Sequence, residues 1–134
     1  MSYPYVFNDA GRSTSKRPRQ KNDCTVRAFA LTRGIAYDEA YDILKAAGRK
    51  CATSFNFGAW IKDQPFARKI SFPAVKGNPR MNPAEFCRNF AKGRYIVRTA
   101  KHVFAIIDGF VHDDHVTYDA RCIYAAWEIN AAER

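Results

Sequence analysis

The order of apolar and polar positions predicts helices in the first part of the chain and strands in the last. Apolar stripes at helical spacing cover residues 24–33 and 38–47, and a glycine follows each stripe. We expect Asp38 to cap the second of these helices. A further helix should begin at Asn82-Pro83-Ala84-Glu85, which combines a cap, a proline at the first helical position and an acid in the first turn.

The strand pattern begins at Arg94. The predicted strands cover residues 95–97, 103–107, 110–112 and 122–129. Asp108-Gly109 is a two-residue hairpin signal between the second and third of them. Residues 49–80 are less regular, because three prolines argue against long elements there, and we expect only a helical turn near 55–61 and a short strand near 70–75. Helices followed by antiparallel strands predict the α+β class.

Composition narrows the kind of protein. With 134 residues, 47% of them hydrophobic, the chain can bury the core of one globular domain. It has no apolar run of membrane-spanning length and no apolar signal core, so we expect neither a membrane span nor secretion. The four cysteines are scattered and form no Cys-x-x-Cys pair, which disfavours a zinc ribbon or a thioredoxin-type site and favours reduced thiols inside a cell.

Much of the net charge of +9 comes from one short segment. Five cations fall there with no acid between them: Arg12, Lys16, Arg17, Arg19 and Lys21. Without these five the charge is +4, which is ordinary for a small domain. We therefore expect a flexible basic N-terminal arm over residues 1–19, with a first short strand or docking segment in residues 1–8, and a folded domain over residues 20–134. The arm could bind nucleic acid or an acidic protein partner, or it could border a substrate cleft and select acidic substrates.

Cys24 stands where the first helix is predicted to begin. A thiol at a helix N-terminus lies at the positive end of the helix dipole, which favours the thiolate. The alternative is a small structural cysteine buried in a core helix. If another part of the chain places a base beside this thiol, the interpretation of Cys24 as a nucleophile is favoured over that of a structural cysteine.

The predicted hairpin can supply that base. Alternation along its two strands places His102 and Asp113 on one face, diagonal to each other and within reach of a hydrogen bond, whereas Asp114 points to the other face unless a bulge intervenes. A histidine held by a carboxylate is what a general base requires. We therefore expect Cys24 as nucleophile, His102 as base and Asp113 as the orienting acid, with Asp114 as the alternative third residue.

The run His112-Asp113-Asp114-His115 also raises the question of a metal site. Neighbouring residues alternate faces, so only Asp113 and His115 would converge, and no second ligand cluster is evident in the sequence. We expect no metal and no other cofactor.

These two regions resemble papain-like cysteine peptidases. Asn22-Asp23-Cys24 at the start of a helix is similar to their nucleophile segment, and Lys101-His102-Val103-Phe104-Ala105-Ile106-Ile107-Asp108-Gly109 followed by Phe110-Val111-His112-Asp113 is similar to the segment that carries their histidine. The likeness is strongest to compact bacterial and phage-encoded members, and weaker to peptidase domains that cleave double-glycine leader peptides. It covers about residues 20–48 and 94–129.

The resemblance implies a papain-like fold, in which the Cys24 helix packs on a small antiparallel sheet that presents His102. It also implies a role for Gln20, whose side-chain amide would form an oxyanion hole together with the backbone N–H of Cys24. The implied activity is that of a cysteine peptidase or isopeptidase, which transfers an acyl group from a protein or peptide substrate through a Cys24-His102-Asp113 triad. The implied location is the cytoplasm of a bacterium or of a phage-infected host cell.

Two alternatives remain open at this stage. The same scaffold can carry out acyl transfer to an amine or deamidation, because an amine can replace water in resolving the acyl-enzyme. A non-catalytic papain-like module could instead bind nucleic acid or an acidic protein through its basic surface.

Overall fold

The computed structural model describes residues 3–50, 55–71, 76–77, 80–116 and 122–132. Within these residues it contains α1 (Cys24–Arg33), α2 (Tyr37–Ala46), α3 (Phe57–Ile61), α4 (Pro83–Asn89) and the short 3-10 helix η1 (Arg12–Thr14). The strands are β1 (Tyr5–Phe7), β2 (Ala67–Ile70), β3 (Arg94–Thr99), β4 (His102–Ile107), β5 (Phe110–Asp113) and β6 (Ala125–Ile129). The predicted α+β class is confirmed.

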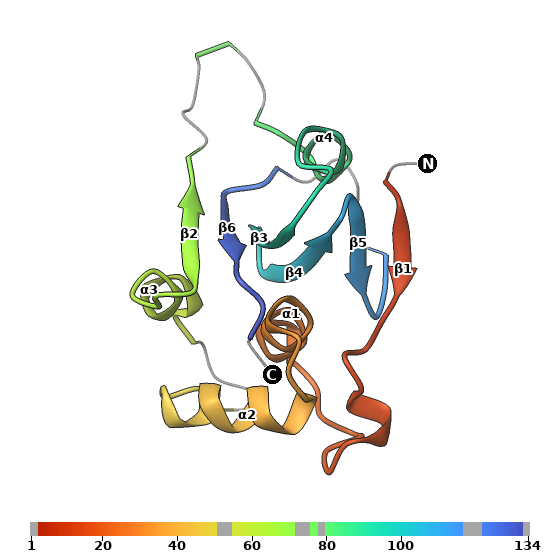
Figure 1. Ribbon diagram of the computed structural model, residues 1–134, viewed down its shortest axis with the longest axis vertical. Coiled ribbons are helices and arrows are strands. Elements are labelled where there is room, and N and C mark those ends of the chain that lie inside the picture. The colour runs from red at the N-terminus through yellow and green to blue at the C-terminus, as the bar shows by residue number, and fades with distance from the viewer. Residues whose placement is uncertain (1–2, 51–54, 72–75, 78–79, 117–121, 133–134) are drawn as a thin grey trace.

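The six strands form one sheet in the order β1-β5-β4-β3-β6-β2 (Figure 1). β3 pairs antiparallel with β4 and β6, and β2 pairs antiparallel with β6. β1 instead runs parallel to β5. The sheet is therefore mixed, whereas the sequence predicted only antiparallel strands. A parallel neighbour needs a long crossover, and here most of the chain lies between the two strands.

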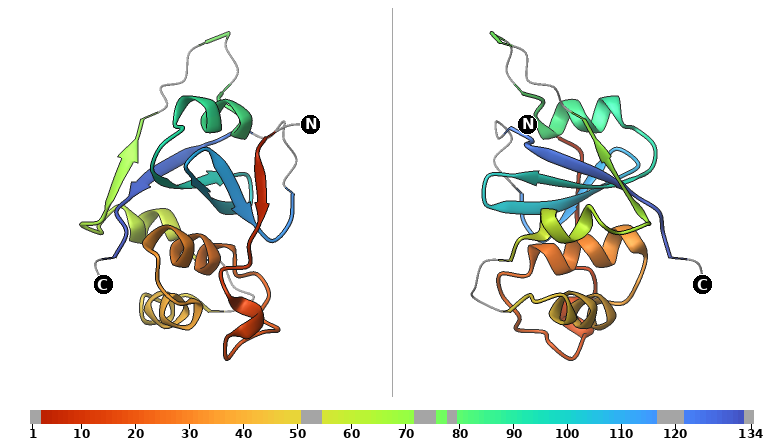
Figure 2. Two further views of the ribbon diagram at one scale, coloured as in Figure 1. Left: turned by 45° about the vertical axis from the view of Figure 1, so that its right-hand side comes forward. Right: turned by 90° about the vertical axis from the view of Figure 1, so that its left-hand side faces the viewer.

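Helices cover both faces of the sheet (Figures 1 and 2). One hydrophobic cluster lies between the sheet and α1, α2 and α3, and it includes Phe29, Leu44 and Trp127. A second cluster lies between the sheet and α4, where Phe86 stacks on Phe90. None of the helices in the described part of the chain is long and apolar enough to cross a membrane.

Helix α1 occupies the position that fixes the site. It begins at Cys24 and ends at Gly34, whose φ of 68° is the left-handed conformation of a helix C-cap, as predicted. Residues 26–30 are all buried, so the buried surface of α1 is wider than the single apolar stripe that the sequence predicted. The reason is that α1 contacts α2 on one side and the sheet on the other. Leu31, which belongs to that stripe, is only partly buried.

Two predicted helix starts have different outcomes. α4 has the predicted start, with a complete capping box between Asn82 and Glu85. The prediction that Asp38 caps the second helix was wrong, because α2 begins one residue earlier and Ala36 holds the cap position. The Asp38 carboxylate accepts the backbone N–H of Lys16 at 2.9 Å and pairs with Arg17 at 2.7 Å, so tertiary contacts occupy it.

The predicted strands agree with the structure over most of the sheet. The hairpin register is as expected, with Ile107 opposite Phe110 and Ala105 opposite His112. The strand expected near 70–75 appears as β2, which begins earlier, and residues 72–75 lie outside the described residues. In the predicted strand 122–129, residues 122–124 precede β6.

Residues 3–19, which belong to the predicted arm, lie against the rest of the protein. β1 forms one edge of the sheet, and the hydroxyl of Tyr5 donates to the backbone carbonyl of Asp113 at 3.0 Å. Arg17 pairs with Asp38 and with Asp42, and its guanidinium lies 3.8 Å from the ring centre of Tyr41.

Candidate active site

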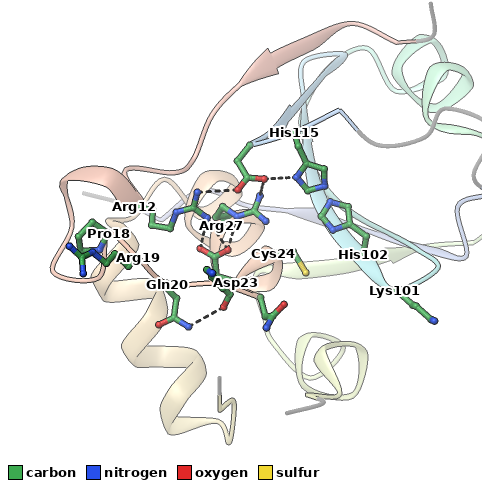
Figure 3. Close-up of a pocket in the computed structure, with 13 residues that line it drawn as sticks. Arg12, Pro18, Arg19, Gln20, Asp23, Cys24, Arg27, Lys101, His102 and His115 are labelled. Carbon is green, nitrogen blue, oxygen red and sulfur yellow. Dashed lines mark hydrogen bonds and ion pairs between the residues drawn. The ribbon is translucent and has the colours of Figure 1, made fainter. Parts of the chain in front are cut away.

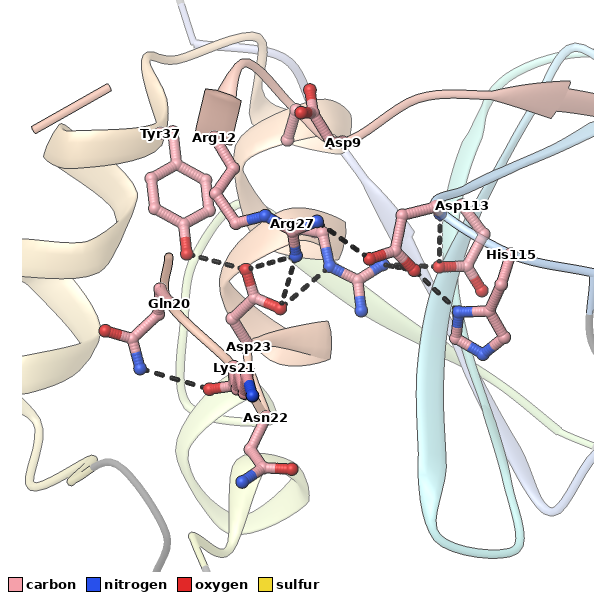
Figure 4. A network of polar contacts seen from close by, with 12 residues as sticks. Asp9, Arg12, Gln20, Lys21, Asn22, Asp23, Arg27, Tyr37, Asp113 and His115 are labelled. Carbon is pink, nitrogen blue, oxygen red and sulfur yellow. Dashed lines mark hydrogen bonds and ion pairs between the residues drawn. The ribbon is translucent and has the colours of Figure 1, made fainter. Parts of the chain in front are cut away.

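Three of the predicted site residues meet where α1 approaches the sheet. Figure 3 shows Cys24 and His102, and Figure 4 shows Asp113. Cys24 is the first residue of α1, His102 is the first residue of β4, and Asp113 is the last residue of β5. Each side chain therefore sits at the end of a regular element, held by packed backbone on one side. The sequence separates Cys24 from the other two by most of the chain.

The imidazole of His102 is held by Asp113. Its Nε2 lies 2.7 Å from Oδ2 of Asp113, and its ring stacks on Phe104 with centroids 5.6 Å apart. Asp113 is 1% exposed, and its other oxygen accepts the backbone N–H of Asp114 at 2.8 Å. The burial and the second hydrogen bond fix the carboxylate in place, so it fixes the orientation of the ring in turn.

The sulfur of Cys24 lies beside the ring of His102 and the backbone N–H of Val103, and both neighbours favour its thiolate form. Since Nε2 of the ring is taken by Asp113, Nδ1 is the nitrogen left for the sulfur. Burial by itself raises the pKa of Cys24, but the hydrogen bond and the charge of His102 outweigh it, so the pKa lies below the usual value. Burial likewise lowers the pKa of His102, yet the hydrogen bonds to Asp113 and Cys24 raise it to about 9.

These opposite shifts favour one charge state at neutral pH. A lowered pKa of the thiol beside an imidazole whose pKa is raised to about 9 shifts the equilibrium from the neutral pair toward a thiolate–imidazolium ion pair. Such a pair is a nucleophile ready to attack, with a proton donor beside it. The carboxylate of Asp113 stabilises the imidazolium.

Arg27 supports this arrangement from the core (Figure 4). It lies one helical turn after Cys24 and is 6% exposed. Its guanidinium bonds to Asp113, lies 3.1 Å from Asp114 and donates through Nε to Asp23 at 3.0 Å. The nucleophile helix and the strand that carries the orienting acid are thereby joined by one buried cation.

Asp23 is the second part of this support. It occupies the N-cap position of α1, but its side chain makes no capping hydrogen bond. Its carboxylate instead accepts from Arg27, from Arg12 at 3.1 Å and from the hydroxyl of Tyr37 at 2.6 Å. Arg12 also pairs with Asp114 at 3.1 Å, so the network connects Asp23 at the start of α1 with the residue that follows β5.

The sequence interpretation missed Arg27 and the buried role of Asp23. The spacing of an acid and an arginine at i and i+4 directly around the predicted nucleophile was the signal available. A charged residue within an otherwise apolar helix has to find a partner if it is buried. Only the fold shows that the partners of Arg27 include Asp113, the carboxylate that also bonds to His102.

Asp113 and Asp114 have different contacts. Asp113 bonds to His102, whereas Asp114 lies 2.6 Å from Nδ1 of His115 and pairs with Arg12 and Arg27. The strand alternation that favoured Asp113 over Asp114 therefore matches the observed contacts.

Gln20 lies in the wall of the same cavity as Cys24. Its side-chain amide donates to the carbonyl of Lys21 at 3.1 Å, so it contacts its own loop (Figure 3). Asn22 lines the cavities on both sides of Cys24 and has a φ of 54°, in the left-handed region. The loop before Cys24 thus contributes two amide side chains to the wall of the cavity that Cys24 also lines.

His102, Asp113 and His115 also bring three possible metal-ligand atoms within 4.8 Å of one another. The sequence placed only Asp113 and His115 together, and the structure adds His102, whose ring centre lies 5.0 Å from that of His115. Both oxygens of Asp113 already bond to protein groups, to Arg27 and the backbone N–H of Asp114 on one side and to Nε2 of His102 on the other. This bonding fits a triad better than a metal centre.

Two cavities flank the sulfur of Cys24. One has a volume of about 510 Å³ and is bordered by the loop around Gln20 and by Asp114 and His115. The other has a volume of about 620 Å³ and lies toward α3 and the turn between β3 and β4. Cys24 and His102 line both, so an extended chain can lie across the sulfur and continue on either side.

Comparisons of this chain with protein-family models, with curated proteins and with solved structures find no match. Its function therefore has to come from the chemistry of the residues that meet at Cys24.

Proposed function

We propose that this protein is a cysteine peptidase or isopeptidase with a papain-like arrangement, in which Cys24 is the nucleophile, His102 the general base and acid, and Asp113 the orienting residue. The observation that carries the proposal is that Cys24 and His102 share the walls of two cavities, while the His102 ring is hydrogen-bonded to the buried carboxylate of Asp113.

Several further features support acyl transfer. The backbone N–H of Cys24 is one of the unpaired donors at the start of α1, so it can stabilise an oxyanion near the sulfur. Gln20 would supply the second donor after its amide leaves the carbonyl of Lys21, and Asn22, which borders the same cavity, is the alternative. The cavities on both sides of the sulfur provide room for the parts of a peptide that flank the scissile bond.

The reaction follows from the charge state of the pair. The thiolate of Cys24 attacks the carbonyl carbon of an amide or isopeptide bond, and the carbonyl electrons move to oxygen. The tetrahedral intermediate collapses as His102 gives its proton to the leaving amine, which leaves a thioester on Cys24. His102 then takes a proton from water, the resulting hydroxide attacks the thioester, and the sulfur leaves as thiolate with the carboxylic acid as product.

Selective alkylation tests the proposal without a known substrate. Iodoacetamide at pH 6 should modify Cys24 far faster than Cys87, because burial raises the pKa of Cys87 to about 11 and only about one such thiol in 100,000 is ionised at that pH. His102→Ala should slow the labelling of Cys24. The matched control is His112→Ala, which removes an imidazole that contacts Asn8 and lies outside the site.

Hydrolysis completes the test. A mixture of internally quenched peptides should be cleaved by the native protein and by His112→Ala, but not by Cys24→Ala or His102→Ala. Equal labelling of Cys24 and Cys87, together with cleavage that survives Cys24→Ala, would reject the assignment.

A further inference from the structure

We infer that the cavity between α1, α3 and the β3–β4 turn binds an acidic group of the substrate, next to the bond that Cys24 attacks. This inference rests on the proposed peptidase function and names the class of substrate: a peptide with an Asp or Glu side chain close to the scissile bond on one side.

The charges that line this cavity all have one sign. Arg49, Arg98 and Lys101 border it, and among the described residues no Asp or Glu does. Its remaining wall contains apolar side chains, including Phe55 and Val103. Apolar walls lower the local dielectric constant, so the three cations act more strongly on a bound carboxylate than they would on an open surface.

Two of the cations are available to a ligand. Arg98 lies near the end of β3 and Lys101 lies in the turn that leads to His102, and both side chains are exposed. Over the described part of the chain, neither has a carboxylate within ion-pair distance. Lys101 has a φ of 59°, which is uncommon outside turns, and it lines the cavities on both sides of Cys24.

Arg49 independently supports the binding of an acidic group in this cavity. It is 5% exposed, and its Nη2 donates to the carbonyl of Asn22 at 2.8 Å, but within the described residues it has no carboxylate partner. A buried cation without a counterion is unfavourable, and a carboxylate in this cavity would supply one. Because Asn22 is two residues before Cys24, a ligand at Arg49 would lie close to the reacting bond.

The cavity on the other side of Cys24 has a mixed lining. Five cations border it together with the carboxylates of Asp23 and Asp114, and they are Arg12, Arg19, Lys21, Arg27 and Lys101. Among the described residues, only the cavity toward α3 combines several cations with no carboxylate in its wall, so an acidic group should meet less repulsion on that side of the sulfur.

A peptide suits this cavity better than a nucleic acid. Binding of single-stranded nucleic acid uses exposed aromatic faces on which bases stack. Phe57, which borders the cavity, is 3% exposed and packs edge-on against Trp127 in the core. It offers no free ring face, whereas a single carboxylate needs only the cations.

Matched peptide pairs test the inference. Internally quenched peptides that differ only by Glu or Gln at one position should be compared along both sides of the cleaved bond, at low and at high salt. We expect kcat/KM to favour Glu by about tenfold at one or two adjacent positions on one side only, since each exposed ion pair contributes modestly and three cations are present. The preference should shrink at high salt.

Charge reversal provides the matched variants. Arg98→Glu should remove the preference for Glu and favour Lys at the same position. Lys92→Glu makes the same change in net charge at an exposed residue that borders neither cavity, and it should leave the preference unchanged.

The possible failures can be told apart. Cleavage that depends on Cys24 but is equal for Glu and Gln at every position would overturn the inference and leave the peptidase proposal standing. Absence of any Cys24-dependent cleavage would overturn both. If an oligonucleotide binds through Arg98 while Glu and Gln peptides are cleaved equally, the cavity recognises phosphate and the acidic-peptide inference is wrong.

Discussion

Asp113→Asn is the substitution that examines the site most directly, because it changes the charge behind His102 and keeps the shape of the side chain. In the native protein, burial lowers the pKa of His102, while Asp113 and Cys24 raise it from 6.5 to about 9. That rise corresponds to about 3 kcal/mol in favour of the imidazolium, net of the cost of burial. Asp113 provides the largest favourable contribution.

The variant should therefore lose much of this stabilisation. An amide at position 113 can still accept a hydrogen bond, but it carries no charge, so the pKa of His102 should fall from about 9 toward 6.5. With Cys24→Ala added, burial is the main influence left, and the pKa should fall below 6.5. Native activity should decline as pH rises through about 9, since His102 then loses the proton that the leaving amine needs.

Proton NMR of the histidine rings measures this without a substrate. The chain has three histidines, so the Hε1 signals can be assigned with His112→Gln and His115→Gln. In the native protein one signal should titrate near pH 9, and His112 should titrate below 6.5 because burial, together with the charge of Arg94, lowers its pKa.

Asp114→Asn is the matched control. Asp114 contacts His115 and not His102, so the titration of His102 should change much less than in Asp113→Asn. A native His102 signal that titrates near 6.5, or one that Asp113→Asn does not move, would refute the coupling of Cys24, His102 and Asp113.

Four further outcomes can be measured. Arg27→Met should lower the free energy of unfolding in urea by ~3 kcal/mol, since it removes the buried cation shared by the carboxylates of Asp23 and Asp113. Arg68→Met breaks an exposed pair and should cost less than ~1 kcal/mol, and equal losses would contradict the buried network. Asn82→Ala should cost ~1 kcal/mol by removing the cap of α4, and an unchanged urea midpoint would show that this cap contributes little. If Gln20 donates to the oxyanion, Gln20→Ala should lower kcat about 100-fold while the alkylation rate of Cys24 stays constant; an unchanged kcat would exclude it. A metal chelator should leave peptide cleavage unaffected, and a loss that zinc restores would favour a metal centre.

Local patterns were enough to predict the parts of the site that lie within single elements. A helix start at Cys24 and a hairpin around Asp108-Gly109 follow from caps, spacing and turn residues, and both lie where the sequence placed them. The hairpin register then placed His102 beside Asp113, because strand alternation decides which side chains share a face.

Contacts between distant segments could not be predicted in this way. Periodicity carries no information on which strand lies beside which, so the parallel pairing of β1 with β5 and the place of β2 at the far edge were not expected. Asp38 was a good local cap, but its contacts with Lys16 and Arg17 across the fold occupy it. The role of Arg27 could not be predicted for the same reason, since its partner Asp113 in β5 is far from it in the sequence.

The pairing of β1 with β5 bears on when the site forms during translation. Cys24 is made 78 residues before His102, and Asp113 is made after that. β1 must then wait for β5 before the edge of the sheet can close around Asp113. A nascent chain would thus carry Cys24 without its partners until the β4–β5 hairpin has been made, and the proposed site could form only after that point.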